Sequence, residues 1–179
     1  YMKLEESFVH YGNIDITPFL DILELLEEKD WERYTFRQDE HPYHAATKTI
    51  PLLYDEEFGI ERGKESTFYN RFKDCIRAVE EKLDAEIIRF VIVNLPAGAK
   101  IKKHYDKAKD SFHIHKRLHL PLITHPDVKF TVGNETIWMK PGELIEINNN
   151  GQLHGVENNS SIDRIHCIID WHDKKKSVI

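Results

Sequence analysis

The chain has 179 residues and a formal net charge of -6 at pH 7, and this length suits one domain with a sizeable apolar core. We therefore expect a single domain over residues 1–179. The negative charge argues against nucleic acid as a partner, and the lack of any run near roughly 18 apolar residues argues against a membrane span. Cys75 and Cys167 lie in apolar patterns, which indicates buried free thiols and a reducing cytoplasm.

Residues 1–85 have the patterns of a mostly helical region. A Thr-Pro pair predicts a helix start at Thr17, and apolar residues then recur at helical spacing up to about Asp30. A second helix is predicted over 66–83, because Ser66 can cap it and the apolar residues that follow form one stripe. We expect these helices to pack on one face of a sheet.

A polar segment and a short apolar run lie between the two predicted helices. The run TKTIPLLYD, residues 47–55, is typical of a strand, and Pro51 favours an edge position. The polar segment before it is loop-like, and binding residues are disproportionately found on loops. His44 is therefore a candidate substrate contact, a possibility that it shares with Trp31, Tyr34 and Arg37. A helix end packed on the core would explain Trp31 equally well. We expect residues 1–85 to shape the substrate pocket.

From residue 86 to 173, short apolar runs alternate with turn residues, which is the pattern of a sandwich or barrel. Strands are predicted at 87–95, 99–104, 112–123, 128–132, 135–139, 143–147, 153–157 and 162–171. The segments between them carry the Gly, Pro, Asn and Asp residues of antiparallel turns. The predicted fold class is mainly β (α+β): a double-stranded β-helix, the cupin-like jelly roll, with the N-terminal helices packed on one sheet. Residues 174–179 are predicted to be a solvated basic tail.

Three side chains have the spacing of a metal site. In the run His-Tyr-Asp, His104 and Asp106 point to the same side if the chain is extended, because side chains alternate along a strand. The third ligand must come from a distant strand. His154 is suited to this, because it follows a Gly-containing turn and Gly155 leaves space beside the metal. Two histidines and one carboxylate leave positions on Fe(II) open for a cosubstrate and oxygen.

An arginine interrupts an apolar strand ten residues after His154. This residue, Arg164 in DRIHCIIDW, follows by about one strand and one turn, which returns it to the same barrel interior. A buried arginine is costly unless an anion meets it, and a guanidinium makes two parallel bonds to a carboxylate. Arg164 is therefore predicted to hold the far carboxylate of 2-oxoglutarate.

Four polar side chains alternate with other residues in FHIHKRLHLPL: His113, His115, Arg117 and His119. Period two puts all of them on one face of a strand. In an outer strand they would face water, whereas in a barrel they would line the cavity near the metal. Arg117 and His119 could then bind the metal-proximal carboxylate of 2-oxoglutarate or an anionic substrate group. Asn94, in FVIVNL, either faces this cavity or caps the LPAG turn.

From about Ile88 to Asp173 the sequence resembles the aspartyl/asparaginyl β-hydroxylase family of Fe(II)/2-oxoglutarate oxygenases. The resemblance rests on HYD, RLHLPL, WMKPGELIEINNNGQLHGVEN and DRIHCIIDWHD, in that order. It implies the following roles: His104 and His154 as metal histidines, Asp106 as the carboxylate ligand, Arg164 on the C5 carboxylate, and Arg117 with His119 as a second anchor. The vertebrate enzyme that names the family lacks the carboxylate ligand, so its substrate does not transfer to this chain.

The resemblance and the residues together predict an Fe(II)/2-oxoglutarate-dependent dioxygenase. Its substrate is expected to be an anionic small molecule or peptide, an amino acid or a peptidyl residue of the Asp, Asn or Pro kind, and O2 would be consumed with release of succinate and CO2. Two alternatives remain open. One is a 2-oxoglutarate-independent cupin-type metalloenzyme with His113, His115 and His154 as ligands. The other is a non-catalytic, cupin-like binding module.

Overall fold

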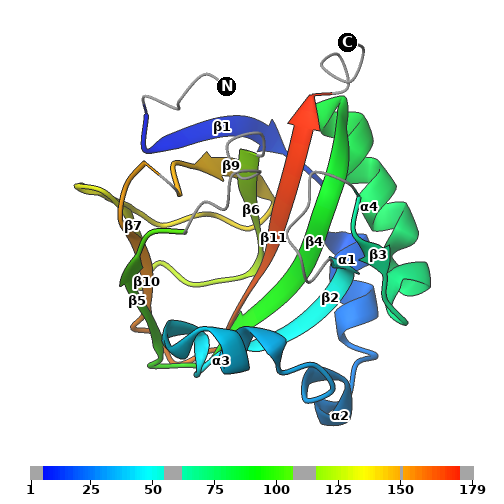
Figure 1. The fold of residues 1–179 in the computed structure, drawn as a ribbon, viewed down its shortest axis with the longest axis horizontal. Coiled ribbons are helices and arrows are strands. Elements are labelled where there is room, and N and C mark those ends of the chain that lie inside the picture. Colours follow the sequence, from blue (N-terminus) through cyan, green and yellow to red (C-terminus); the bar gives the residue numbers. More distant parts are fainter. Residues whose placement is uncertain (1–5, 55–61, 107–115, 150, 174–179) are drawn as a thin grey trace.

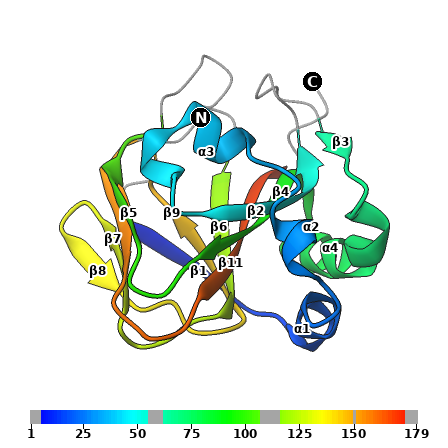
Figure 2. The ribbon, with the colours of Figure 1, turned by 90° about the horizontal axis from the view of Figure 1, so that it is seen from below.

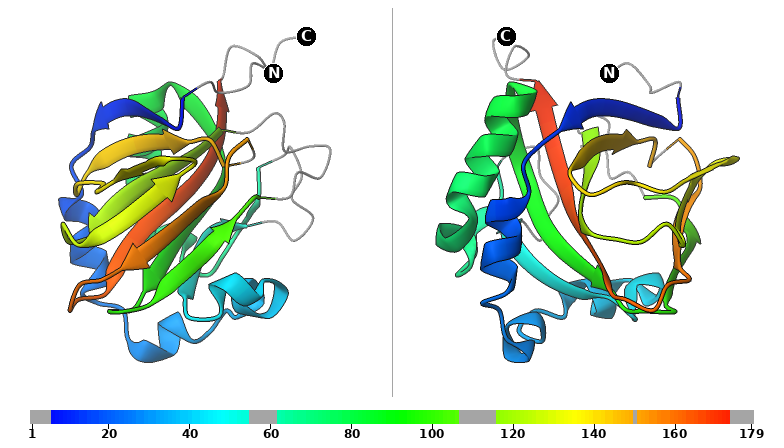
Figure 3. Two further views of the ribbon diagram at one scale, coloured as in Figure 1. Left: turned by 90° about the vertical axis from the view of Figure 1, so that its left-hand side faces the viewer. Right: turned by 180° about the vertical axis from the view of Figure 1, so that it is seen from behind.

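Two antiparallel β-sheets face each other, and helices cover the outer face of the larger sheet (Figures 1 and 3). The computed structural model describes residues 6–54, 62–106, 116–149 and 151–173. The termini of the described chain lie on strands of the larger sheet, at the same end of the molecule (Figure 1).

The larger sheet has seven strands, which are listed here in spatial order. They are β1 (Phe8–Asn13), β9 (Glu143–Ile147), β6 (Lys116–Ile123), β11 (Arg164–Asp173), β4 (Ala85–Leu95), β2 (Lys48–Tyr54) and β3 (Lys64–Glu65). The smaller sheet has the order β5 (Lys100–His104), β10 (His154–Asn158), β7 (Val128–Val132) and β8 (Glu135–Ile137). From β4 to β11 the described chain passes back and forth between the sheets, with the β7–β8 hairpin as the one pair of consecutive strands in the same sheet. This is the path of a double-stranded β-helix, and it confirms the predicted jelly roll.

The eight strands predicted from residue 87 onward correspond to β4 to β11. The 112–123 prediction is confirmed over 116–123, and its first four residues lie outside the described part of the chain. The first 85 residues are less helical than expected, because they also contribute β1, β2 and β3 to the larger sheet. The predicted basic tail, 174–179, also lies outside the described residues.

The helical elements are α1 (Thr17–Leu23), α2 (Glu28–Trp31), α3 (Phe36–Glu40), the 3-10 turn η1 (Pro42–His44) and α4 (Tyr69–Leu83). The single helix expected from Thr17 to about Asp30 is wrong, because the chain leaves the helix after Leu23 and restarts with a capping box at Glu27. Leu25, in the break, is 75% exposed. The second predicted helix is confirmed as α4, and the Ser66 hydroxyl accepts a hydrogen bond from the Phe68 amide at 3.1 Å just before it.

The main apolar core lies between the helices and the larger sheet. One stripe of α4 is buried there, namely Phe72, Cys75, Ile76 and Val79. The helix packs on β4 and β2. The same cluster includes outward side chains of β6 and β11, among them Leu118, Leu120, Cys167, Ile169 and Trp171. Both cysteines are free thiols and buried, as predicted. A second apolar cluster fills part of the space between the sheets, so the remaining space there is available for a site.

Pro51 lies near the edge of the larger sheet. The edge strand β3 pairs only with Leu53 and Tyr54 of β2, so it does not reach Pro51. Pro51 was predicted to lie at an edge because proline has no amide hydrogen to donate to a neighbouring strand. The position beside it, which β3 leaves unpaired, agrees with this prediction. The segment that contains α3 and η1 lies across one end of the sandwich (Figure 2). No described helix is long and apolar enough to cross a bilayer.

Candidate metal centre and cosubstrate pocket

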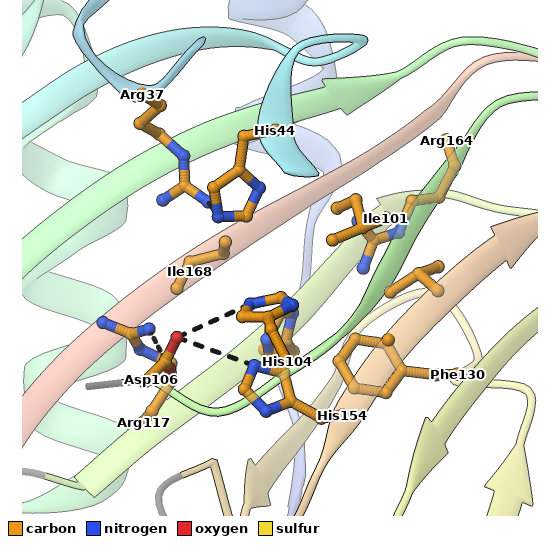
Figure 4. Close-up of a pocket in the computed structure, with 13 residues that line it drawn as sticks. Arg37, His44, Ile101, His104, Asp106, Arg117, Phe130, His154, Arg164 and Ile168 are labelled. Carbon is orange, nitrogen blue, oxygen red and sulfur yellow. Dashed lines mark hydrogen bonds and ion pairs between the residues drawn. The ribbon is translucent and has the colours of Figure 1, made fainter. Parts of the chain in front are cut away.

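The predicted ligand trio comes together between the two sheets, at one end of the smaller sheet. His104 ends β5 and His154 begins β10, and the two residues are direct partners across these strands. The Oδ1 atom of Asp106 lies 3.6 Å from Nε2 of His104 and 3.7 Å from Nε2 of His154. The three ligand atoms lie within 4.8 Å of one another, and Figure 4 shows them converging.

Close pairing of β5 and β10 makes this meeting possible. A Cβ added at Gly155 would lie 2.9 Å from the carbonyl oxygen of Ile101 and 3.0 Å from the amide nitrogen of Lys103. Glycine is therefore needed at this position so that the two backbones can approach. Gly155 was expected to leave space beside the metal. The space it leaves is instead taken by the backbone of β5.

Both histidines are prepared to act as neutral ligands. Nδ1 of His104 lies 2.7 Å from the carbonyl oxygen of Lys102. Nδ1 therefore carries the proton and donates a hydrogen bond to this oxygen, and the lone pair of Nε2 faces Asp106. Burial lowers the pKa of His104, and it lowers the pKa of His154 to about 4. Neutral imidazoles are the form that binds a metal ion.

The two carboxylate oxygens of Asp106 have different surroundings. Oδ1 faces the histidines, whereas Oδ2 accepts hydrogen bonds from Nη1 of Arg117 at 2.5 Å and from Nδ2 of Asn149 at 2.6 Å. The Asp106 amide also donates to the carbonyl oxygen of Asn149 at 3.1 Å. Burial alone would raise the pKa of Asp106, but the charge of Arg117 and the Asn149 hydrogen bond hold this pKa below its ordinary value. Asp106 is thus an ionised, oriented carboxylate.

Arg117 is itself held by a second carboxylate. Its Nε and Nη2 donate to the two oxygens of Asp170 at 2.8 and 2.9 Å, and Arg89 donates to Asp170 from the other side at 2.9 Å. Burial would lower the pKa of Arg117, but Asp106 and Asp170 raise it overall. The bonds described for Arg117 therefore orient Asp106. Its predicted role as a cosubstrate anchor stays a prediction, as does that of His119, which is buried in the same pocket.

Arg164 lies deep in the pocket and has very different neighbours. Its side chain is 1% exposed, and Nη2 donates to Nδ1 of His166 at 2.6 Å. Among the residues that the structure describes, no carboxylate pairs with Arg164, and its Nε has no hydrogen-bond partner. Burial, together with the charge of Arg37, lowers the pKa of Arg164 to about 9. An uncompensated buried cation of this kind is suited to an anionic ligand.

The pocket that joins these groups encloses about 390 Å³, including its open mouth. In Figure 4 the metal trio lies in the lower part of the pocket, with Arg37 and His44 from the α3–η1 segment above it on one side and Arg164 above it on the other. Apolar side chains complete the wall, including Ile101, Phe130, Val156 and Ile168. The pocket thus has a cation on each of two sides and a possible metal site that faces both.

These residues fit the groups that the sequence analysis predicted. Two imidazole nitrogens and one carboxylate oxygen are the donor set of non-haem Fe(II) oxygenases. The Arg164 guanidinium has an unpaired, buried Nε that a carboxylate would satisfy. The ligand trio and a buried guanidinium line one pocket, so the site has the elements needed for both Fe(II) and 2-oxoglutarate.

Other candidate residues have different positions. Asn94 donates from Nδ2 to Asp163 at 3.1 Å, and Asp163 also accepts from the amide of Ala97 in the following turn at 3.1 Å. This favours the turn role of Asn94 over a cavity role. His113 and His115 lie outside the described residues, so the cupin-type alternative that uses them stays a prediction.

Three residues that orient the site, Asn149, His166 and Asp170, are absent from the sequence-based prediction. Asn149 lies in the run NNNGQ, which was read only as a turn, and no local signal separates it from its neighbours. Asp170 and His166 do carry a signal, because a polar side chain in the apolar strand DRIHCIIDW is costly to bury without a partner. Both lie on the same face of β11 as Arg164, since His166 follows it by two residues and Asp170 by six.

The comparisons with known proteins agree with this architecture. No sequence among the curated proteins matches the chain. Among solved structures, a 2OG-Fe(II) oxygenase-family oxidoreductase from Burkholderia pseudomallei is similar, with 13% identity, a TM-score of 0.54, and coverage of 71% of this chain and 68% of that one. The viral collagen prolyl hydroxylase of Paramecium Bursaria Chlorella virus-1 has 9% identity, a TM-score of 0.56, and coverage of 93% and 96%. At such identities, these likenesses show a shared fold.

The comparison with protein families identifies the family of the chain, and not only its fold. The model described as Aspartyl/Asparaginyl beta-hydroxylase matches residues 15–173. This span includes the ligand trio, both pocket arginines of the larger sheet and the α3–η1 segment. The match covers most of the chain, and the protein therefore belongs to the aspartyl/asparaginyl β-hydroxylase family.

Proposed function

We propose that the protein is an Fe(II)/2-oxoglutarate-dependent dioxygenase that hydroxylates an anionic amino acid or peptidyl substrate and releases succinate and CO2. One observation carries this proposal. A His-Asp-His cluster shares a pocket with Arg164, a buried guanidinium that has no carboxylate partner among the described residues. The family membership of the chain supports the same reaction type.

His104, Asp106 and His154 would hold the iron through Nε2, Oδ1 and Nε2. When bound, iron and 2-oxoglutarate supply the oxidation by O2, in which one oxygen atom enters the substrate as hydroxyl and the other enters succinate. The protein contributes orientation and exclusion of water. Arg117 and Asn149 keep Oδ2 of Asp106 turned away from the histidines.

Arg164 would bind the C5 carboxylate of 2-oxoglutarate, because two parallel N–H donors match the two oxygens of a carboxylate. Arg117 and His119 are proposed to contact the other end of the cosubstrate. Phe130 and Ile168 form an apolar wall between these ends, which excludes water and strengthens the charged contacts.

The proposed substrate is anionic because the other side of the pocket has an arginine to receive it. Nη2 of Arg37 lies 3.2 Å from Nε2 of His44, and no acidic side chain in the described segments forms an ion pair with Arg37. Arginine can only donate, so Nε2 of His44 accepts and Nδ1 carries the proton. His44 is 8% exposed and this Nδ1 has no hydrogen-bond partner among the described residues. The pair thus offers several donors to a substrate carboxylate.

A screen for substrate-dependent succinate formation tests the proposal. The protein would receive Fe(II), 2-oxoglutarate and O2 with free amino acids or with peptides that contain Asp, Asn or Pro. We expect one anionic substrate to raise succinate formation above the background, with an equal amount of product that is heavier by one oxygen atom. In the Arg37→Met variant the KM for that substrate should rise about tenfold or more, as expected for a lost charge-assisted contact. The Arg33→Met variant is the control, because Arg33 is exposed on the adjacent segment.

Three outcomes would contradict the proposal. Hydroxylation that proceeds without 2-oxoglutarate would favour the cupin-type alternative, and so would metal binding that survives His104→Ala but is lost in His113→Ala. Binding of the metal and 2-oxoglutarate without turnover of any tested compound would favour the non-catalytic module.

A further inference from the structure

One face of β11 carries polar side chains into the space between the sheets. Arg164, His166, Ile168 and Asp170 alternate with Ile165, Cys167, Ile169 and Trp171, which belong to the apolar core under the helices. His166 is therefore the next side chain on the face that carries Arg164. It is 1% exposed, and the proposed reaction gives it no role.

The direction of the hydrogen bond between these two residues is fixed by chemistry. A guanidinium has donors but no acceptor, so Nδ1 of His166 must accept the bond from Nη2 of Arg164 at 2.6 Å. The proton of the neutral ring is then on Nε2, which has no hydrogen-bond partner in the described part of the chain. Burial and the nearby charge of Arg164 lower the pKa of His166 well below its ordinary value, so the ring stays neutral.

A neutral imidazole and a carboxylate would have different effects on the charge of Arg164. A carboxylate at this position would orient the guanidinium and also cancel its charge, as Asp170 and Asp106 do for Arg117. An imidazole orients the guanidinium through one bond and leaves its positive charge for a ligand. His166 also lies near His119, with ring centroids 5.8 Å apart, and that ring is neutral for the same physical reason.

We infer that His166 is a positioning residue for the cosubstrate: it holds Arg164 toward the pocket through Nδ1 while leaving the guanidinium charge available to the far carboxylate of a 2-oxo diacid. The identity of that diacid rests on the proposed function. The geometry of the Arg164–His166 pair does not depend on it.

The test uses three substitutions that separate orientation from charge. His166→Asn keeps an acceptor near the position of Nδ1, His166→Asp adds a negative charge in the same shape, and His166→Leu removes the acceptor. The Mn(II)-loaded protein would be titrated by calorimetry with 2-oxoglutarate and with 2-oxopentanoate, which has a methyl group in place of the far carboxylate. The ratio of the two affinities measures the contribution of that carboxylate alone.

We expect the wild type to prefer 2-oxoglutarate strongly. His166→Asp should reduce the preference by about 100-fold, because its negative charge would compensate the charge of Arg164. His166→Leu should reduce it by about tenfold, because it removes the hydrogen bond that orients the guanidinium. His166→Asn should keep most of the preference. Mn(II) affinity should change little in all three variants, and His125→Asp, which adds the same charge at an exposed turn, should behave as the wild type.

The inference would be overturned if His166→Asp and His166→Asn showed the same preference, or if all variants weakened both ligands equally, as a purely structural residue would. If His166→Asp does not fold, the comparison of His166→Asn with His166→Leu still decides the question. A wild type with no preference for 2-oxoglutarate would instead contradict the proposed function, so the two failures can be told apart.

Discussion

Arg117 and Arg164 are largely buried arginines that line the same pocket, yet their surroundings are opposite. Arg117 donates to two carboxylates, those of Asp106 and Asp170, and these raise its pKa. Arg164 donates to a neutral imidazole, and burial lowers its pKa. Protein carboxylates compensate the charge of Arg117. The charge of Arg164 has no carboxylate partner among the described residues, and its Nε has no hydrogen-bond partner there.

The difference indicates which arginine has its charge compensated by the protein, whatever else it contacts, and which depends on a ligand for an anionic partner. Burial of a charge costs free energy unless a partner compensates it, and a protein keeps an uncompensated charge where function requires it. The ion pairs of Arg117 therefore orient the carboxylate of Asp106. The unpaired guanidinium of Arg164 has the properties of a binding site for an anion. Four experiments can break or sharpen this contrast, and a fifth tests the cosubstrate site itself.

The largest expected effect is on folding stability. Arg117→Met would leave the buried carboxylates of Asp106 and Asp170 without one of their cations, which should lower the free energy of unfolding by about 3–5 kcal/mol. Arg164→Met removes a charge with no acidic partner in the described structure, so it should leave stability unchanged or raise it. Urea unfolding of the two metal-free variants measures both values. Equal decreases in the free energy of unfolding of the two variants would contradict the difference proposed between Arg117 and Arg164.

The next effect is on cosubstrate affinity. Arg164→Met should weaken 2-oxoglutarate binding about 100-fold, because it removes two charge-assisted bonds of the C5 carboxylate. Arg164→Lys should recover part of the loss, since lysine keeps the charge but not the paired donors. Calorimetry on the Mn(II)-loaded proteins gives the affinities. An unchanged affinity in Arg164→Met would remove Arg164 from the cosubstrate site.

A smaller effect concerns the metal. Asn149→Ala removes one of the two donors that hold Oδ2 of Asp106, and loss of such an outer contact typically weakens metal binding by about tenfold or more. Competition with a fluorescent chelator would report Mn(II) affinity. Asn159→Ala is the matched control, because Asn159 is exposed in the turn after β10. A variant of Asn149 that binds as tightly as the control would argue against this orienting role.

The smallest effect is the dependence of stability on pH. Burial, with the charge of Arg37, lowers the pKa of His44 to about 2, whereas the unfolded chain keeps an ordinary pKa. The unfolded state therefore takes up the proton first, so stability is full above about pH 6.5 and is lost as the pH falls. His44 should account for about 1 kcal/mol between pH 7 and pH 5.5. His44→Asn should flatten the pH profile of the unfolding free energy, and an unaltered profile would refute this assignment.

The sequence predicted the strands of the jelly roll well because their signals are local. Alternation and turn residues mark β4 to β11 within a few positions. The six-residue strand β1 was missed because its reason to be extended is the distant strand β9, and its own side chains are largely half-buried or exposed. The break after Leu23 was missed because the apolar spacing continues to Leu26, which packs on the core without being helical.

The same distinction holds for the candidate site. His104, Asp106, His154 and Arg164 could be predicted because their spacing and their family resemblance are visible in the chain, and the structure brings them to one pocket. Their roles stay predictions. Asn149 and Asp170 could not be assigned, because their bonds to Asp106 and Arg117 join positions 43 and 53 residues apart. Only the folded backbone brings such partners together.

An anaerobic titration tests the central claim most directly. Fe(II) would be added to the protein with 2-oxoglutarate, and the visible absorption of the chelate would be followed in the wild type and in Arg164→Met. We predict a charge-transfer band that appears only when both Fe(II) and 2-oxoglutarate are present, saturates at one equivalent of iron, and needs far more 2-oxoglutarate in the variant. If the wild type gives no band, or if both proteins need the same amount of 2-oxoglutarate, the assignment of this pocket is contradicted.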